Sequence, residues 1–359
     1  MTQDVNTNRH LAEKLKRMTQ VAVLDDALFL EHEAPPEHPE RAERLVAVRE
    51  GLNRAGTFLR LEARDASDEE LGRVHDPGYI ESLGHLAGRS GYLDSDTYLS
   101  PRTIAAARRA AGSAVGLVEV LSRGTTRFGF ALPRPPGHHA LADRAMGFCL
   151  LNNVAVAAAH ARVLGHERVL VLDWDVHHGN GTEAIFYADP SVLFISLHQF
   201  PNYPGTGAAT DHGAGEGRGS SVNLPLPAGA DDGVYSAAFE RIVLPVIEQF
   251  APSLALVSCG FDAHARDPLA GMRLSASGYA AMTRSLLLTL PKACPLGLVL
   301  EGGYDLEALR DSSEAVARVL LGSSATPERS ESSSSSPSPA HSAALAAVAQ
   351  AQSPFWKLT

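Results

Sequence analysis

The sequence has 359 residues, of which 45% are hydrophobic and 20% are charged. This is the composition of a folded globular protein, and it excludes collagen-like, coiled-coil and wholly disordered chains. The 41 acidic residues outnumber the 31 lysines and arginines, so the formal net charge is −10. Because proteins that bind nucleic acid directly normally carry a basic surface, we expect no nucleic-acid partner.

The three cysteines, Cys149, Cys259 and Cys294, form no CxxC pair. An odd number of dispersed cysteines excludes a disulfide framework and a structural zinc knuckle, and it indicates a reducing compartment. The first twenty residues lack the apolar core of a secretory signal, and no apolar run approaches the ~20 residues that span a membrane. We therefore expect a cytoplasmic protein that does not bind membranes.

Composition divides the chain into four parts. Residues 1–20 form a polar, flexible lead, and residues 21–321 alternate apolar runs with helical patterns in one domain. Serine and proline dominate residues 322–342, which is typical of a flexible linker. Residues 343–359 are expected to form a short alanine-rich helix and a tail whose apolar end docks on the domain.

Six short apolar runs lack polar alternation, as expected for parallel strands that are buried on both faces. They are Val21–Leu24, Phe128–Leu132, Arg168–Leu172, Val192–Leu197, Leu254–Ser258 and Leu296–Leu300. Apolar residues at helical spacing predict helices. These helices span Arg102–Leu121, Asn152–Leu164, Asp232–Phe250, Ser277–Leu290 and Leu306–Leu321. Strand–helix alternation predicts an α/β fold with a parallel sheet covered by helices on both faces.

Polar residues gather where four of these strands end. The four segments are Arg134–His139, Asp173–Gly181, Cys259–His264 and Glu301–Asp305. In an open α/β sheet the ligand crevice lies outside the carboxyl ends of the strands. We therefore expect the four segments to meet in one active site.

A metal site is the first chemistry that these segments indicate. Asp175 and His177 are two residues apart in extended chain, so their side chains point the same way, and Asp262 follows another strand at the same edge. Three protein ligands that leave one position open are typical of a catalytic site. Mixed nitrogen and oxygen ligands suit zinc, although Fe(II), Co(II) and Mn(II) fit nearly as well. The alternative is that all three residues only cap loops.

The adjacent His138 and His139 are candidate proton-transfer groups, because two buried imidazoles both need partners. Asp173 and Asn180 are candidate partners. A carboxylate raises imidazole basicity more than an amide does, so the two histidines can hold different protonation states. The alternative is a pair of surface-loop residues.

An aromatic group accompanies this site. Tyr304 follows two glycines, and its hydroxyl can donate to an oxyanion opposite a metal. Gly147 and Phe148 can line an apolar channel together with Tyr203, which lies in a glycine- and proline-rich loop over Pro201–Gly219. Long loops inside a domain are usually functional. Each of these aromatic residues could instead be a packing residue.

The ordered motifs RPPGHHA, MGFCLLNN, DWDVHHGNGT, SLHQF with PGTG, SCGFDAH and EGGY allow a family comparison. Over about Val21 to Leu321 the sequence resembles the histone deacetylase and acetylpolyamine amidohydrolase superfamily, in particular its class II-like bacterial histone-deacetylase-like amidohydrolases. The resemblance implies an arginase-like three-layer α/β fold with a central, eight-stranded parallel sheet. It also implies that residues 21–321 are the catalytic domain.

The activity implied by the resemblance is zinc-dependent hydrolysis of N-acetylated amines, mainly acetyl-lysine in proteins or peptides. Asp175, His177 and Asp262 match the ligands of one zinc ion per chain. The family also binds potassium near the zinc. Its ligands match Asp173, Ser196 and Leu197, together with Asp175 and His177.

The same resemblance implies roles for the other polar residues. His139 matches the general base that takes the proton of the attacking water, with Asn180 beside it. His138 matches its neighbour, which is held by Asp173 and acts electrostatically or in proton delivery. Tyr304 matches the residue that polarises the acetyl carbonyl together with zinc.

Four further positions match the substrate-binding residues of the family. Gly147, Phe148 and Tyr203 correspond to the walls of the substrate tunnel, and Asp96 corresponds to an acidic rim residue that grips the substrate backbone.

Three alternative functions remain open. An acetylpolyamine or other small-molecule deacetylase would use the same site, because rim loops set the substrate class. A binuclear manganese ureohydrolase would need additional bridging carboxylates. A non-catalytic acetyl-lysine-binding module would be expected to lack a ligand, the base or the tyrosine. The sequence does not define the oligomeric state.

Overall fold

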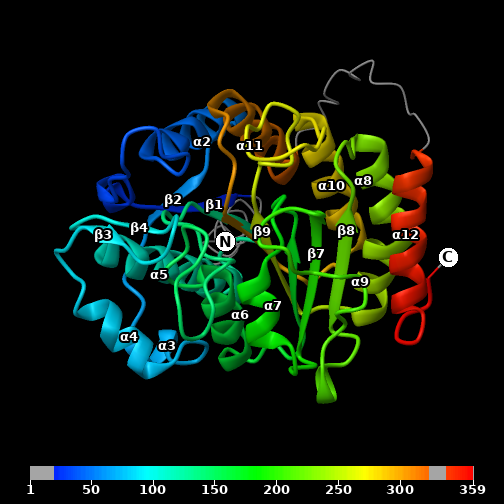
Figure 1. Ribbon diagram of the computed structural model, residues 1–359, viewed down its shortest axis with the longest axis horizontal. Coiled ribbons are helices and arrows are strands. Elements are labelled where there is room, and N and C mark those ends of the chain that lie inside the picture. The colour runs from blue at the N-terminus through cyan, green and yellow to red at the C-terminus, as the bar shows by residue number, and fades with distance from the viewer. Residues whose placement is uncertain (1–19, 323–336, 359) are drawn as a thin grey trace, which may run out of the picture.

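The computed structural model describes residues 20–322 and 337–358. Within them lies a sheet of eight strands, all parallel, in the order β2-β1-β5-β10-β9-β6-β7-β8 (Figure 1). The strands are β1 (Val21–Asp25), β2 (Leu59–Glu62), β5 (Phe128–Ala131), β6 (Val169–Asp173), β7 (Val192–Gln199), β8 (Ser221–Leu226), β9 (Leu254–Cys259) and β10 (Leu296–Leu300). The predicted α/β class and parallel sheet are confirmed.

The six strands predicted from apolar runs are present in this sheet, and its other two are the edge strands β2 and β8. The runs also did not reveal β3 (Gly91–Tyr92) and β4 (Tyr98–Leu99), which form a separate antiparallel pair. The sequence of β2 is Leu-Arg-Leu-Glu, and its residues alternate between partly buried and exposed. The sequence of β8 includes Asn223 and Pro225. Proline is tolerated at a sheet edge because no further strand needs its missing N–H.

Helices cover both faces of the sheet, as predicted. Alternate residues of β1 point to opposite faces: Val21 and Val23 join one apolar layer, and Ala22 and Leu24 join the other. The first layer lies under α2 (Ala42–Ala55), α8 (Asp232–Ala238), α9 (Leu244–Phe250), α10 (Ala276–Thr289), α11 (Leu306–Leu320) and α12 (Pro339–Gln352). The second lies under α3 (Asp68–Leu71), α4 (Pro77–Gly84), α5 (Thr103–Ser122), α6 (Asn153–Val163) and α7 (Asn180–Phe186) (Figure 1).

Three predicted elements differ from the structure. The expected helix over Asp232–Phe250 consists of α8 and α9 joined by a π-helical turn at Phe239–Val243. The C-terminal helix α12 begins at Pro339 rather than at residue 343, because Ser338 accepts a hydrogen bond from the His341 N–H and proline suits a first helical position. The predicted linker over 322–342 therefore extends too far, because residues 339–342 belong to α12. Residues 323–336 lie outside the described residues.

The strand register brings the carboxyl ends of the central strands to one level. Asp173 at the end of β6 lies opposite Ser196 of β7 and Ser258 of β9. Leu300 at the end of β10 lies opposite Cys259 of β9. The polar segments that follow these strands therefore leave the sheet at the same edge. In the described part of the chain, no helix is long and apolar enough to cross a membrane.

Candidate active site

Asp175, His177 and Asp262 converge at the carboxyl edge of the sheet, and we call them the strand-edge triad. Their ligand atoms all lie within 4.8 Å of one another, and the three residues are buried. His177 Nδ1 is 3.2 Å from Asp175 Oδ1 and 3.2 Å from Asp262 Oδ2. The structure thus brings the three predicted metal ligands together.

Backbone N–H groups orient the two carboxylates of the triad. Asp175 accepts hydrogen bonds from the N–H of Gly302 at 2.8 Å and of His177 at 2.9 Å. Asp262 accepts one from the N–H of Val176 at 2.8 Å. These neutral donors fix the geometry of the carboxylates without cancelling their charge.

The two glycines nearest to the triad are required by close approach. A Cβ atom at Gly260 would lie 2.1 Å from Asp175 Oδ2, and one at Gly302 would lie 2.2 Å from Asp262 Oδ2. Both contacts are far below van der Waals distance. The glycines of the SCGFDAH and EGGY motifs therefore leave room for the two carboxylates.

The electrostatics of the triad fit a divalent cation. Burial and the neighbouring charge of Asp175 raise the pKa of Asp262 to about 7. Burial opposes protonation of His177, but Asp175 and Asp262 outweigh it and raise the pKa of this imidazole to about 10. The two buried carboxylates thus favour a positive charge between them, and a nitrogen and two oxygen donors are a set that zinc accepts.

The first histidine of the pair is held in a charged environment. His138 Nδ1 lies 2.9 Å from Asp173 Oδ2. Burial lowers the pKa of His138, but the charges of Asp173 and Asp175 outweigh burial and hold it well above its ordinary value. His138 is therefore a persistent cation beside the triad.

The second histidine has a neutral partner. His139 Nδ1 donates to Asn180 Oδ1 at 2.7 Å, and the amide group of Asn180 faces the Met146 sulfur at 3.5 Å. Burial, followed by the charges of His138 and His177, lowers the pKa of His139 well below its ordinary value. With Nδ1 carrying the proton, Nε2 of the neutral ring is free to accept another.

Aromatic rings surround these groups. The Tyr203 ring lies 5.1 Å from the His139 ring and 6.2 Å from the His177 ring, and the Phe148 ring lies 6.1 Å from that of Tyr304. Gly147 has a φ of +57°, and a Cβ there would lie 2.6 Å from His139 Cδ2. The three predicted tunnel residues and Tyr304 thus lie around the histidines and the triad.

Tyr304 is held by residues that the sequence did not reveal. Its backbone N–H donates to Asp267 Oδ2 at 2.7 Å. The guanidinium of the buried Arg44 lies 4.9 Å from the centre of the Tyr304 ring and donates to the carbonyls of Gly303 and Glu301. Burial raises the pKa of the Tyr304 phenol well above its ordinary value, so the hydroxyl stays a donor.

Asp96 lies in a tight turn beside Phe148. The Asp96 carbonyl accepts from His38 Nε2 at 3.2 Å, and the His38 ring lies 4.9 Å from the Phe148 ring. The neighbouring Thr97 Oγ accepts from the Phe148 N–H at 3.2 Å. Burial and the adjacent Asp94 raise the pKa of Asp96. The structure therefore places an acidic pair next to an aromatic wall of the site.

The remaining predicted ligands lie on the neighbouring strand. Ser196 and Leu197 belong to β7, and Ser196 is opposite Asp173 in the sheet. Ser196 Oγ contacts His198 Nδ1 at 2.9 Å. Both residues are fully buried.

A second cluster of two carboxylates and one imidazole consists of Glu70, Glu119 and His160, and we call it the peripheral triad. Arg64 donates to Glu70 Oε2 at 2.8 Å and to Glu119 Oε1 at 2.8 Å. A side-chain guanidinium therefore already supplies the positive charge that these carboxylates need.

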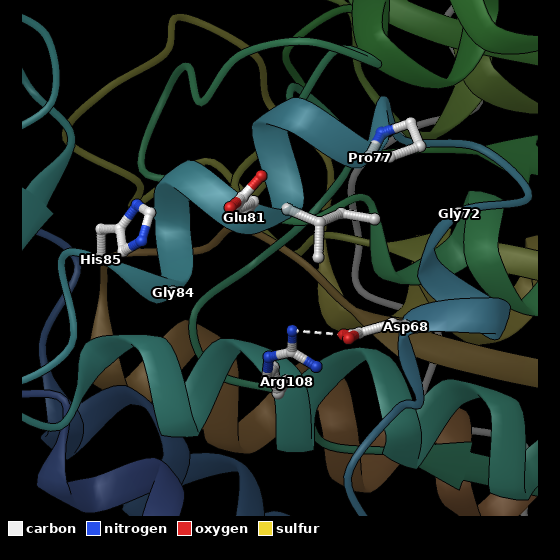
Figure 2. Close-up of a pocket in the computed structure, with 8 residues that line it drawn as sticks. Asp68, Gly72, Pro77, Glu81, Gly84, His85 and Arg108 are labelled. Atoms are coloured by element: carbon white, nitrogen blue, oxygen red, sulfur yellow. Dashed lines mark hydrogen bonds and ion pairs between the residues drawn. The ribbon is translucent and has the colours of Figure 1, made fainter.

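A surface cavity of about 430 Å³ lies between α4 and α5 (Figure 2). Its lining residues are Asp68, Gly72, Pro77, Ile80, Glu81, Gly84, His85 and Arg108. Arg108 and Asp68 pair with each other across it. It shares no residue with the predicted site, so the strand-edge triad remains the candidate centre.

The parallel sheet and the polar cluster at its carboxyl edge define an α/β protein with a candidate metal site. A model of the histone deacetylase domain matches residues 38–320. The chain belongs to the histone deacetylase family. The predicted resemblance is confirmed, and the chain is a deacetylase-family hydrolase.

Three similar proteins illustrate this membership. The chain is 45% identical over 279 residues to a histone deacetylase-like amidohydrolase of Pseudomonas aeruginosa. This alignment covers 75% of this chain and 72% of the relative. It is 42% identical over 307 residues to the human polyamine deacetylase HDAC10. That alignment covers 80% of this chain and 45% of the relative. The solved HD domain of the plant protein HDA15 superposes with a TM-score of 0.86 at 40% identity, covering 94% of this chain and 96% of that structure.

The chain spans about half the length of several curated relatives that it matches. The names of these relatives include both histone and polyamine deacetylases. Family membership therefore implies an acetylated substrate without selecting its class.

Proposed function

We propose that this chain is a zinc-dependent deacetylase that acts on N-acetylated amines, above all on acetyl-lysine in proteins or peptides. The supporting observation is that a buried Asp-His-Asp triad lies beside a neutral histidine, with a distance of 6.0 Å between the His177 and His139 rings. One zinc ion held by the triad would polarise the acetyl carbonyl and lower the pKa of a water molecule.

His139 is the general base in this proposal. Its Nε2 atom accepts a proton from the attacking water, because Nδ1 already donates to Asn180. The same Nε2 atom then returns the proton to the leaving amine. The lowered pKa of His139 keeps the ring neutral and ready to accept.

His138 acts through its charge. The ring is 4.0 Å from that of His139 and stays protonated because Asp173 binds its Nδ1. A fixed cation at this distance favours release of the proton from His139 to the leaving amine. Asp173 in turn anchors His138; burial raises the pKa of Asp173 to about 6 although His138 opposes this, so the carboxylate is ionised at neutral pH.

Tyr304 donates its hydroxyl proton to the carbonyl oxygen as negative charge develops on it. The raised pKa of the phenol keeps this donor protonated at neutral pH. Gly147, Phe148 and Tyr203 form the walls that admit a long, apolar acyl-amine side chain. Asp96 at the rim accepts hydrogen bonds from the incoming substrate.

A potassium ion is the second cofactor that we propose. Its ligands would be Asp173, Ser196 and Leu197, with Asp175 and His177. The adjacency of β6 and β7, where Asp173 faces Ser196, supports this assignment. A bound cation there would offset the cluster of buried carboxylates.

An acetylpolyamine or another small acetylated amine is the second candidate substrate. The acidic pair Asp94 and Asp96 beside Phe148 suits a cationic ligand, and a relative at 42% identity is named a polyamine deacetylase. The long loop over Pro201–Gly219 favours a peptide substrate instead. Competition between an acetyl-lysine peptide and an acetylpolyamine for the same enzyme would rank the two.

We also propose that residues 21–321 form the catalytic domain and that the C-terminal segment, described over residues 337–358, packs on it. The three cysteines, all within the described residues, are buried and unpaired, which supports a reducing compartment such as the cytoplasm. We propose neither nucleic acid nor membrane as a partner. Size-exclusion chromatography with light scattering would measure whether the chain forms an oligomer.

Acetate release from an acetyl-lysine peptide by zinc-loaded protein tests the proposal. We expect release by the wild-type chain and none by Asp175→Ala. A folded, zinc-loaded wild-type protein that releases no acetate would contradict the acetyl-lysine assignment. Release from an acetylpolyamine alone would then establish the second candidate.

A further inference from the structure

The segment that follows α12 packs on the loop that carries Tyr203. Trp356 Nε1 donates to the carbonyl of Gly219 at 2.9 Å. The Phe355 ring lies 4.9 Å from the His212 ring. Gly219 has a φ of +92°, and a Cβ atom there would meet Phe355 Cγ at 2.8 Å. The Phe355 ring therefore lies directly on the backbone at the far end of this loop.

Hydrogen bonds within the loop and to β8 connect the residues of its outer half, 208–219. The Gly219 N–H donates to the His212 carbonyl at 2.6 Å. Ala208 and Asp211 are joined by two bonds, from the Ala208 N–H to Asp211 Oδ2 at 3.1 Å and from the Asp211 N–H to the Ala208 carbonyl at 2.9 Å. Asn223 of β8 donates to the Asp211 carbonyl at 3.1 Å.

The inner half of the loop is fixed next to the candidate site. His198 Nε2 lies 2.9 Å from the Gly207 carbonyl oxygen, and His178 Nδ1 lies 2.8 Å from Thr206 Oγ. Three residues before Thr206, the Tyr203 ring lies 5.1 Å from the His139 ring. A continuous set of contacts thus joins the C-terminal tail to the wall of the site.

We propose that Phe355 and Trp356 are positioning residues for the substrate tunnel, because they hold the far end of this loop and thereby hold Tyr203 against His139. The tail lies beyond residue 320, where the match to the family model ends. This inference rests on the proposed function, since it assumes that Tyr203 lines the tunnel.

The anchor of α12 is separate from these two rings. Leu345 and Val348 are fully buried against the first apolar layer. Gln352 Nε2 donates to the Ser221 carbonyl at 3.1 Å, on the open edge of β8. Truncating Phe355 or Trp356 should therefore loosen the loop while α12 stays docked.

The test uses full-length Phe355→Ala and Trp356→Phe, assayed for kcat and KM on the acetyl-lysine peptide. We expect KM to rise about five-fold in Phe355→Ala, as for the loss of one interaction, with kcat changed less than about two-fold. Trp356→Phe keeps an aromatic ring of smaller area and loses the indole N–H donor, so its KM should rise less. Val316→Ala, in the buried face of α11, is the matched control: it should lower the Tm without changing KM.

Hydrogen–deuterium exchange of the loop gives a readout that does not depend on activity. Amides over residues 203–212 should exchange faster in Phe355→Ala than in the wild type and in Val316→Ala, while those of β9 stay unchanged. Unchanged loop exchange, or a KM that rises equally in Val316→Ala, overturns the inference. If the wild-type chain releases no acetate, the proposed function fails, and loop exchange alone decides the role of the tail.

Discussion

The strand-edge triad and the peripheral triad have the same chemical composition, two carboxylates and one imidazole. In both, the ligand atoms lie within 4.8 Å of one another. They differ in what satisfies the carboxylates. Neutral backbone N–H groups bind those of the strand-edge triad, whereas the guanidinium of Arg64 binds both carboxylates of the peripheral triad.

The difference appears in the pKa of one carboxylate from each cluster. Burial and Asp175 raise the pKa of Asp262 to about 7. Hydrogen bonds from Arg64 lower that of Glu70 to about 2, although burial opposes this. The two carboxylates of the strand-edge triad differ: the charges of His138 and His177 lower the pKa of Asp175 although burial opposes this, whereas burial and Asp175 raise that of Asp262. The positive charges beside this triad are titratable imidazoles, whereas a permanently charged arginine pairs with both carboxylates of the peripheral triad. Local charge balance, rather than residue type, separates a candidate metal centre from an ion-pair network.

The largest effect should follow from removing a ligand of the strand-edge triad. Asp175→Ala removes one of two carboxylates, so the zinc site is lost and acetate release should fall on the order of 10³-fold or more. The matched change in the peripheral triad, Glu119→Gln, should leave kcat/KM within about two-fold of the wild type. Equal losses in the two variants would remove the distinction between the clusters.

Tyr304→Phe should have the next largest effect. The variant keeps the ring above Arg44 but loses the hydroxyl donor, which typically costs ~10²–10³-fold in kcat. Zinc content and Tm should match the wild type, because the hydroxyl is not needed for the fold. A Tyr304→Phe enzyme with near-normal kcat would show that Tyr304 has no role in carbonyl polarisation.

The pH dependence should move when the partner of His139 becomes charged. His139 accepts a proton only when neutral, and its pKa lies below the ordinary value, so kcat/KM should fall only as the pH drops through that lowered pKa. In Asn180→Asp a carboxylate stabilises the imidazolium, so the acid limb should shift to higher pH. A pH–rate profile of both enzymes measures this shift, and coincident acid limbs would mean that His139 is not the titrating base.

The smallest effect should follow from removing the cation of the peripheral triad. Arg64→Met leaves Glu70 without its donor and should lower the free energy of unfolding by about 1–2 kcal/mol, since Arg64 is half exposed. Because the pKa of Glu70 is lowered from 4.5 to about 2, its stabilising contribution is present above pH 4.5 and is lost as the pH falls towards 2.

Urea unfolding of the wild type and of Arg64→Met at several pH values measures this difference. The gap between them should narrow as the pH falls below 4.5. A gap that is constant with pH would show that the ion pair with Glu70 does not cause the stability difference.

Much of the sheet could be predicted because its central strands are buried on both faces and read as plain apolar runs. The edge strands β2 and β8 could not, since one side of each meets solvent or α12 and their sequences mix polar residues and proline with apolar ones. The helix α2 was also missed, although it packs closely on α11. Its pattern is interrupted by the buried Arg44.

The metal ligands, the two histidines and Tyr304 could be gathered from the sequence because each lies in a segment that follows the end of a predicted strand. Asp96 follows no predicted strand and came only from the family resemblance. Arg44 follows none, and Asp267 lies three residues beyond the Cys259–His264 segment; both reach Tyr304 through the tertiary fold. The same limit applied to the peripheral triad. Its residues come from α3, α5 and α6, and no spacing in the sequence links them.

Metal content per chain is the most direct test of the difference between the two clusters. We would equilibrate three purified proteins with zinc: the wild type, Asp175→Ala and Glu119→Gln. After desalting, the zinc content of each would be measured by inductively coupled plasma mass spectrometry. We predict one zinc per chain in the wild type and in Glu119→Gln, and none in Asp175→Ala. Zinc that persists in Asp175→Ala, or that is lost in Glu119→Gln, would contradict the assignment of the strand-edge triad as the metal centre.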